Sequence, residues 1–98
     1  MYKSKEIRNW AINKGIIAHG TKIAQAIKTC EESVELSQAV LKDDIEEIKD
    51  ALGDIYVTIL IQAEMNGITL EECIDRAWNE IKDRKGKMVA GGFFVKES

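Results

Sequence analysis

Residues 31–54 read EESVELSQAVLKDDIEEIKDALGD, and this stretch decides the fold. Acidic side chains gather towards its two ends, and a short polar turn, Lys42-Asp43-Asp44, divides it in the middle. Apolar residues recur at helical spacing on both sides of the turn, which predicts two helices. A turn this short places neighbouring helices antiparallel. The sequence therefore predicts a helical hairpin in which acids from both helices face each other.

Four carboxylates are expected to meet between these helices. Glu32 and Glu35 are three residues apart and Asp50 and Asp54 are four apart, so each pair shares one helix face. At about 1.5 Å per residue, the first pair is centred roughly 15 Å from the turn and the second roughly 13 Å. Carboxylates at nearly the same height repel each other unless cations lie between them. Oxygen ligands without histidine or cysteine favour Mg²⁺, with Mn²⁺ as the alternative.

A solvated acidic face is the other interpretation of these residues, because most glutamates on a helix are simply exposed. The position of Asp54 favours the interpretation as a metal site over a solvated face. It lies on the helix face that continues through Val57 and Ile61. A carboxylate that heads an apolar column is expected to be shielded from water, and shielded acids normally have a partner.

The composition of the 98 residues predicts a single globular domain, 1–98. The chain is 45% hydrophobic and 32% charged, and it has no proline, which favours helix. The net charge of -3 disfavours general nucleic-acid binding. No apolar run approaches the length of a membrane span and no signal peptide is recognised, so a cytoplasmic protein without membrane contact is expected. Cys30 and Cys73 fall on apolar positions and are predicted to be reduced core residues.

Hydrophobic periodicity predicts an all-α, four-helix bundle-like fold. The expected helices span about 4–14, 21–41, 45–66 and 70–85 and are followed by a short C-terminal tail. Ile16 to Gly20 is expected to be a connection. Thr21, Asp44 and Thr69 are expected to cap the later helices.

Several apolar stretches are predicted to face inward. Ile55 to Ile61 is apolar almost all round, which predicts a helix buried on every side, with a short β-strand as the competing prediction. Stripes on the second and fourth helices are expected to face the core; they comprise Ile23, Ile27, Cys30, Val34 and Leu41, and Leu70, Cys73, Ile74, Ala77 and Ile81.

The acidic residues also resemble the signature of a known family. Glu31-Glu32-x-x-Glu35 followed by Gly53-Asp54 resembles the EExxE…ExxD pattern of the all-α nucleoside triphosphate pyrophosphohydrolases, and is most similar to the MazG-like branch with its small phage and bacterial members. The helix order and chain length also match. A further similarity is the Asn/Lys/Arg cluster that follows the acidic motifs in MazG proteins, present here as Asn79, Lys82, Arg84 and Lys85.

One position departs from the family pattern. The motif would put glutamate at position 51, where this chain has Ala51. Asp50 lies one residue earlier, about 100° round the helix. Asp50 or Glu47 is the expected replacement ligand, and a site with fewer metals or an inactive member is the alternative.

The resemblance implies Mg²⁺-dependent hydrolysis of an NTP or dNTP to the monophosphate and pyrophosphate, as in nucleotide-pool housecleaning. Metal ions clamp the phosphate oxygens and lower the pKa of the attacking water. The expected catalytic residues are Glu31, Glu32 and Glu35. The expected metal ligands are Glu32, Glu35, Asp50 and Asp54. The expected substrate-binding residues are Lys28, Asn79, Lys82, Arg84 and Lys85.

Simpler explanations exist for the basic residues. A helix end that complements its own dipole explains a cluster such as Lys82 to Lys87, and nucleic-acid binding is a weaker alternative. Lys28 is alternatively an i,i+4 partner of Glu32. The resemblance further implies a homodimer or dimer of dimers whose subunits frame the site together. The alternative function is a non-catalytic helical oligomerisation or regulatory module with a solvated acidic face.

Overall fold

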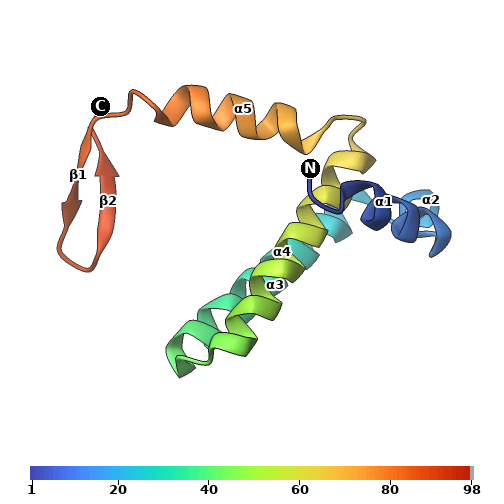
Figure 1. The fold of residues 1–98 in the computed structure, drawn as a ribbon, viewed down its shortest axis with the longest axis horizontal. Helices are drawn as coiled ribbons and strands as arrows, with labels where there is room; N and C mark the ends of the chain where they lie inside the picture. Colours follow the sequence, from blue (N-terminus) through green and yellow to red (C-terminus); the bar gives the residue numbers. More distant parts are fainter. Residues whose placement is uncertain (98) are drawn as a thin grey trace.

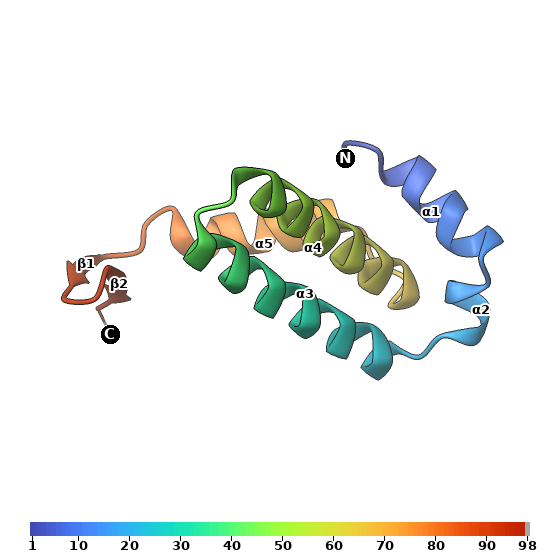
Figure 2. The same ribbon diagram turned by 90° about the horizontal axis from the view of Figure 1, so that it is seen from below.

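The computed structural model describes residues 1–97. Along this part of the chain, five helices precede a two-stranded sheet (Figure 1): α1 (Ser4–Asn13), α2 (Ile16–His19), α3 (Lys22–Lys42), α4 (Ile45–Met65), α5 (Leu70–Ile81), β1 (Gly86–Val89) and β2 (Phe93–Lys96). The two long helices α3 and α4 lie side by side as an antiparallel hairpin, and α1 and α2 pack near its open end (Figure 2). None of the described helices is both long and apolar enough to cross a membrane.

Local sequence signals set the helix ends. The side chains of Thr21 and Asp44 accept hydrogen bonds from backbone amides in the first turns of α3 and α4. Thr69 and Glu72 form a reciprocal capping box at the start of α5. Gly15 follows α1 with φ of 77°, a left-handed conformation that glycine adopts without steric cost. The three predicted caps are therefore confirmed.

Small and polar side chains join α3 to α4. We call the α3 residues that face α4 the first seam; they recur at alternating steps of four and three and comprise Gln25, Thr29, Glu32, Leu36 and Ala39. The Gln25 side-chain amide donates to the backbone carbonyl of Thr58 at 3.1 Å. The Thr29 hydroxyl donates to the Thr58 hydroxyl oxygen at 3.0 Å. These bonds fix the register of the hairpin and thereby the height at which acids on the two helices meet.

The apolar core of the described chain is small. The buried hydrophobic residues are Ala11, Ala39, Ala51, Ala63 and Ile61. The segment from Ile55 to Ile61 is helical, and all its residues are buried or half-buried. The predicted helix is thus confirmed, and the competing β-strand is wrong.

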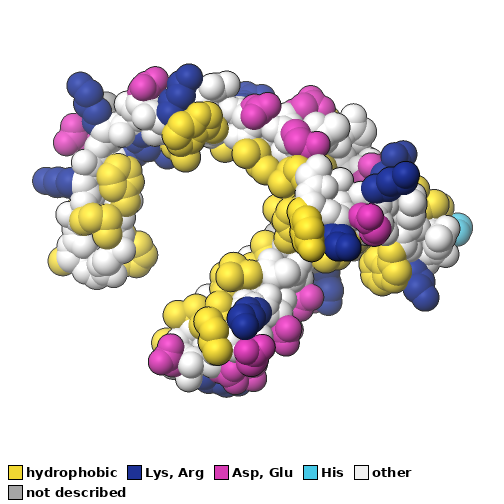
Figure 3. Space-filling view, viewed as in Figure 1, with side chains coloured by type: hydrophobic (Ala, Val, Ile, Leu, Met, Phe, Trp, Pro, Cys, Tyr) yellow, Lys and Arg dark blue, Asp and Glu magenta, His cyan; other side chains and the backbone are white. Residues whose placement is uncertain are grey.

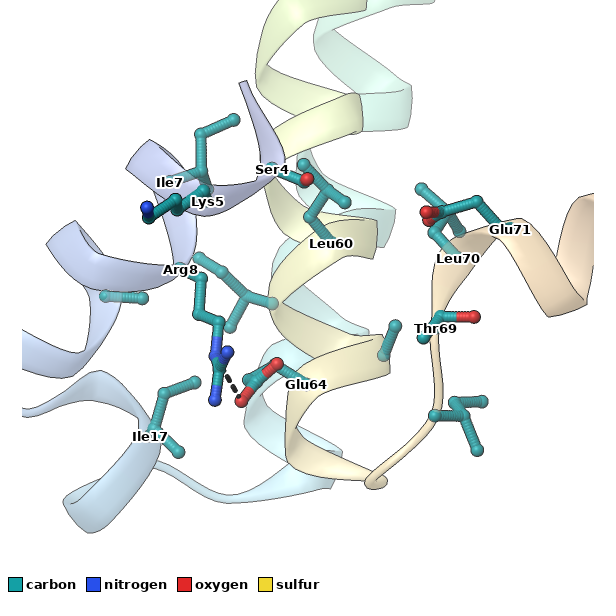
Figure 4. A pocket seen from close by; sticks show the side chains of 14 residues that line it. Ser4, Lys5, Ile7, Arg8, Ile17, Leu60, Glu64, Thr69, Leu70 and Glu71 are labelled. Atoms are coloured by element: carbon teal, nitrogen blue, oxygen red, sulfur yellow. Dashed lines mark hydrogen bonds and ion pairs between the residues drawn. The ribbon is translucent and has the colours of Figure 1, made fainter. Parts of the chain in front are cut away.

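Polar contacts link α1 and the residues before it to the second half of α4. Arg8 Nε donates to Glu64 Oε1 at 2.8 Å, beside a cavity of about 250 Å³ between α1, α4 and the connection to α5 (Figure 4). The Tyr56 hydroxyl donates to the backbone carbonyl of Tyr2 at 2.6 Å. Because Arg8 and Glu64 neutralise each other, neither of these two side chains offers an unpaired charge to a ligand in the cavity.

The four-helix bundle is not confirmed. In the described chain α5 contacts α4 but not α3, and it leads away from the hairpin (Figure 1). This helix ends at Ile81 rather than near Lys85. The segment from Ile16 to Gly20, predicted as a connection, contains the one-turn helix α2. The tail forms an antiparallel β-hairpin in which Gly86 pairs with Lys96 and Val89 with Phe93.

The apolar stripes predicted to face inward are exposed in the single chain. Cys30 and Cys73 are free, as predicted, but exposed rather than buried. The exposed fractions are 69% for Ile23, 53% for Ile27, 57% for Val34, 87% for Leu41, 46% for Ile74 and 48% for Ile81. The physical reason is that α3 packs on α4 through its small, polar face. Its broad apolar face is left without a partner within one chain.

A larger side chain in the first seam should push the two long helices apart. Ala39 is 2% exposed, so Ala39→Leu is expected to lower the free energy of unfolding by about 1–3 kcal/mol through overpacking. Urea denaturation at a fixed protein concentration measures this loss. Ala24→Leu, at an exposed position of the same helix, is the matched control and should change stability by less than about 0.5 kcal/mol. Equal effects of the two substitutions would contradict the packing described.

Candidate metal centre

Carboxylates from α3 and α4 converge on one point. Glu32 and Glu35 of α3 and Asp54 of α4 each place one oxygen so that these three oxygens lie within 4.8 Å of one another. Glu32 and Glu35 share a face because they are three residues apart. Asp54 meets them because antiparallel packing brings residues equally distant from the turn to the same height. The structure thus brings together three of the four predicted metal ligands.

Glu32 is the buried member of this cluster. The residue is 7% exposed. Its Oε1 atom lies 3.5 Å from Lys28 Nζ, whereas its Oε2 atom is buried without a hydrogen-bond partner among the described residues. A buried carboxylate oxygen without a partner is costly because nothing replaces the water it has lost. The donor set therefore fits a divalent cation, which would supply the missing contact.

The pKa values of the neighbouring acids reflect repulsion and desolvation. The pKa of Glu35 is raised because its protonated form can donate a hydrogen bond to the Glu32 carboxylate, and because the charge of Glu32 disfavours the ionised form. Desolvation is the main cause that raises the pKa of Asp54, followed by the charges of Glu32 and Asp50. Asp54 is therefore partly shielded at its carboxyl group although the residue as a whole is exposed. Contacts with Glu32 and Glu31 raise the pKa of Lys28.

A hollow of about 210 Å³ adjoins the cluster and contains the position where this chain departs from the motif. Ala51, which is 5% exposed, lies on its wall together with Asp50 and Glu47. The hollow thus occupies the side of α4 on which a longer residue at position 51 would project. Asp50 and Glu47 border the same space, and a residue that replaces the ligand missing at position 51 would have to do so.

Sequence reasoning missed two residues of this hollow. Gln38 and Lys42 line it beside Glu35, and Lys42 Nζ lies 3.4 Å from Glu47 Oε2. Both follow Glu35 on one helix face, at steps of three and seven residues. This spacing could have identified both residues from the sequence, because it continues the helix face of Glu35 towards the turn.

Other predicted site residues lie outside the cluster. Glu31 is exposed, and its Oε2 atom lies 3.5 Å from Lys28 Nζ, so Lys28 contacts both adjacent glutamates. The predicted i,i+4 pair between Lys28 and Glu32 is present. The remaining residues are exposed on the outer end of α5 or just beyond it: Asn79, Lys82, Arg84 and Lys85. Because α5 does not contact α3, one chain does not bring them to the acids.

Comparison with known proteins identifies the class of this chain. The MazG nucleotide pyrophosphohydrolase domain model matches residues 21–89, which include α3, α4, α5 and β1. The chain therefore belongs to the MazG nucleotide pyrophosphohydrolase domain family, and the resemblance seen in the sequence is confirmed.

The chain is also similar to part of a phage protein. Over 64 residues the chain is 38% identical to the uncharacterized 18.2 kDa protein in the rep-hol intergenic region of Haemophilus phage HP1. The match covers 65% of this chain and 39% of the phage protein, so the chain spans less than half the length of that relative. No solved structure matches.

Removing the buried charge should stabilise the metal-free protein. In Glu32→Gln the orphaned carboxylate is neutral, so the free energy of unfolding should rise by about 1 kcal/mol and the melting temperature by about 4–8 °C. Mg²⁺ should no longer raise the melting temperature, since a ligand is lost. Thermal denaturation at constant ionic strength, with and without Mg²⁺, measures both effects.

The matched control for this substitution is Glu46→Gln. It removes one negative charge from a side chain that is 77% exposed. The control should keep the melting temperature and the Mg²⁺ response of the parent protein. If both variants responded alike, the acidic face would be merely solvated.

Stability should also depend on pH in a specific direction. The pKa values of Glu35 and Asp54 are raised from 4.5 and 3.8, so the folded state holds more protons than the unfolded state. The metal-free protein should therefore lose stability as pH rises through these ordinary values towards neutrality. Mg²⁺ needs ionised ligands, so its effect on the melting temperature should be largest near neutrality and fade on acidification. Glu35→Gln combined with Asp54→Asn should flatten both profiles, and unchanged slopes would contradict this assignment.

Proposed function

We propose that this protein is an Mg²⁺-dependent nucleoside triphosphate pyrophosphohydrolase, which converts an NTP or dNTP to the monophosphate and pyrophosphate. The observation that carries the proposal is the buried, unpartnered oxygen of Glu32 inside a carboxylate cluster. Membership of a nucleotide pyrophosphohydrolase family supports it. The proposed role is clearance of noncanonical or surplus nucleotides in the cytoplasm.

The proposed metal ligands are Glu32, Glu35 and Asp54. Asp50, or Glu47, would supply the ligand that Ala51 cannot, because both line the hollow beside the cluster. Carboxylate oxygens suit Mg²⁺, and Mn²⁺ accepts the same donors. When bound, the ion would neutralise triphosphate charge and lower the pKa of a water molecule.

Glu31 is the proposed base. The reaction requires the water oxygen to bond to the α-phosphorus while the bond from that phosphorus to the bridging oxygen breaks, which releases pyrophosphate. Glu31 is exposed beside the cluster, so it can accept the proton of the water and return it to solvent.

The phosphate contacts are assigned to basic side chains. Lys28 lies next to the cluster and would contact the substrate directly. Lys82, Arg84 and Lys85 would bind the outer phosphates, since ammonium and guanidinium groups form charge-assisted hydrogen bonds with phosphate oxygens. Asn79 would hydrogen-bond phosphate or ribose.

A panel of nucleotides tests the activity. With Mg²⁺, the protein is expected to release pyrophosphate from at least one member of a set of canonical and noncanonical NTPs and dNTPs. Asp54→Asn should lower kcat/KM by at least about 100-fold, the upper end of what outer-shell partners of a metal contribute. Glu46→Gln should retain the parent rate. A folded protein that releases pyrophosphate from none of the nucleotides would contradict catalysis and favour the non-catalytic helical module.

A further inference from the structure

One positive side chain lies among the acids of the hollow beside Ala51. The walls of this hollow carry four carboxylates and one ammonium group, a formal charge of -3; the residues are Glu35, Glu47, Asp50, Asp54 and Lys42. In Figure 3, acidic side chains gather along the α3–α4 hairpin towards its turn, and Lys or Arg side chains lie among them. Because a hollow of this charge attracts cations, a metal ion from solution competes there with the ammonium group that the chain itself supplies.

The fold holds Lys42 at this hollow. Lys42 is the last residue of α3, where the negative end of the helix dipole favours a cation. Asp43 then adopts a left-handed conformation, with φ of 54°, and ends the helix. The turn brings α4 back beside α3, and Lys42 Nζ lies 3.4 Å from Glu47 Oε2. The end of one helix and the start of the next therefore keep an ammonium group at the hollow.

The contact between Lys42 and Glu47 distinguishes the two residues that could replace the ligand missing at position 51. Glu47 has Lys42 as its partner, whereas Asp50 forms no ion pair within residues 1–97. Asp50 also lies close to the carboxylate cluster, since its charge adds to burial and to the charge of Glu32 in raising the pKa of Asp54. Asp50 is therefore the replacement ligand that remains available.

We propose that Lys42 takes the place of a second metal ion, so that each chain holds one divalent cation. This ion lies at the carboxylate cluster of Glu32, Glu35 and Asp54, with Asp50 as its further ligand. The hollow measures about 210 Å³, so a second divalent cation inside it would lie within several ångströms of both the first ion and the ammonium group. Like charges at such distances repel each other strongly.

The inference rests on the function proposed above for the metal itself, and it adds how many ions the chain binds and which residue sets that number. With one ion held by the protein, the rest of the triphosphate charge is left to the ion that accompanies the nucleotide and to basic side chains. The number of bound ions can be measured without any nucleotide, so the measurement does not depend on catalysis.

Counting Mn²⁺ ions tests the role of Lys42. Mn²⁺ accepts the oxygen ligands that suit Mg²⁺, and the EPR signal of the free ion gives the number bound at each total concentration. The parent protein should bind one Mn²⁺ per chain. Lys42→Glu removes the ammonium group and adds a carboxylate, so this variant should bind two Mn²⁺ per chain. The two neighbouring ions should also broaden each other's EPR signal.

Lys49→Glu is the matched control. Lys49 and Lys42 each pair with a glutamate in the first turn of α4, at 3.3 Å and 3.4 Å, and their side chains are 66% and 63% exposed. Both substitutions change the net charge by the same amount, but Lys49 does not line the hollow. The control should therefore bind one Mn²⁺ per chain, as the parent does.

Lys42→Gln provides a second test, which also serves if circular dichroism shows that the Lys42→Glu variant does not fold. This substitution removes the charge without adding a ligand. A second Mn²⁺ should then bind at concentrations at least about tenfold below those at which the parent takes one up, because the repulsion from the ammonium group is lost.

The possible results separate this inference from the proposed activity. Two ions in the parent, one ion in folded variants of Lys42, or two ions in the Lys49→Glu control would each overturn the role of Lys42 and leave the activity in place. A parent that binds one ion but hydrolyses no nucleotide would contradict the activity alone. A parent that binds no ion would overturn both.

Discussion

Repulsion among the carboxylates of Glu32, Glu35 and Asp54 is the constraint on which the rest of the structure depends. One oxygen of each lies within 4.8 Å of the others. At that separation two unit charges repel by about 1 kcal/mol in water and about 3.5 kcal/mol at an effective dielectric constant of 20. The hairpin keeps the acids together because Gln25 and Thr29 bond to Thr58 across the first seam. A fold that maintains such a cluster is suited to holding a cation.

Much of this site could be predicted from sequence because its determinants are local. Thr21, Asp44 and Thr69 mark helix starts through bonds to their own first turns. The convergence of Glu32, Glu35 and Asp54 required only helical spacing and a short turn of known position. The burial of Glu32 was not predicted, because it depends on which face of α3 packs against α4.

The rest of the fold depends on information that the helical period does not contain. The apolar residues Ile27 and Val34 indicate that one face of α3 is hydrophobic, but the helical period does not say what covers that face, and both side chains are exposed in the described chain. For the same reason, the direction of α5 could not be read from its amphipathic pattern. The β-hairpin did leave a local signal. Gly91 and Gly92, with φ values of 91° and 83°, separate two short strands as a hairpin turn requires.

The scarcity of buried side chains has a consequence for what keeps the chain folded. Apart from Ile61, the buried hydrophobic residues of the described chain are alanines, which contribute little to the hydrophobic free energy of folding. A chain with so small an apolar core gains a large share of its stability from any ligand that binds its folded state alone. The supply of such a ligand in the cell would then set both the folded fraction and the lifetime of the protein against proteolysis.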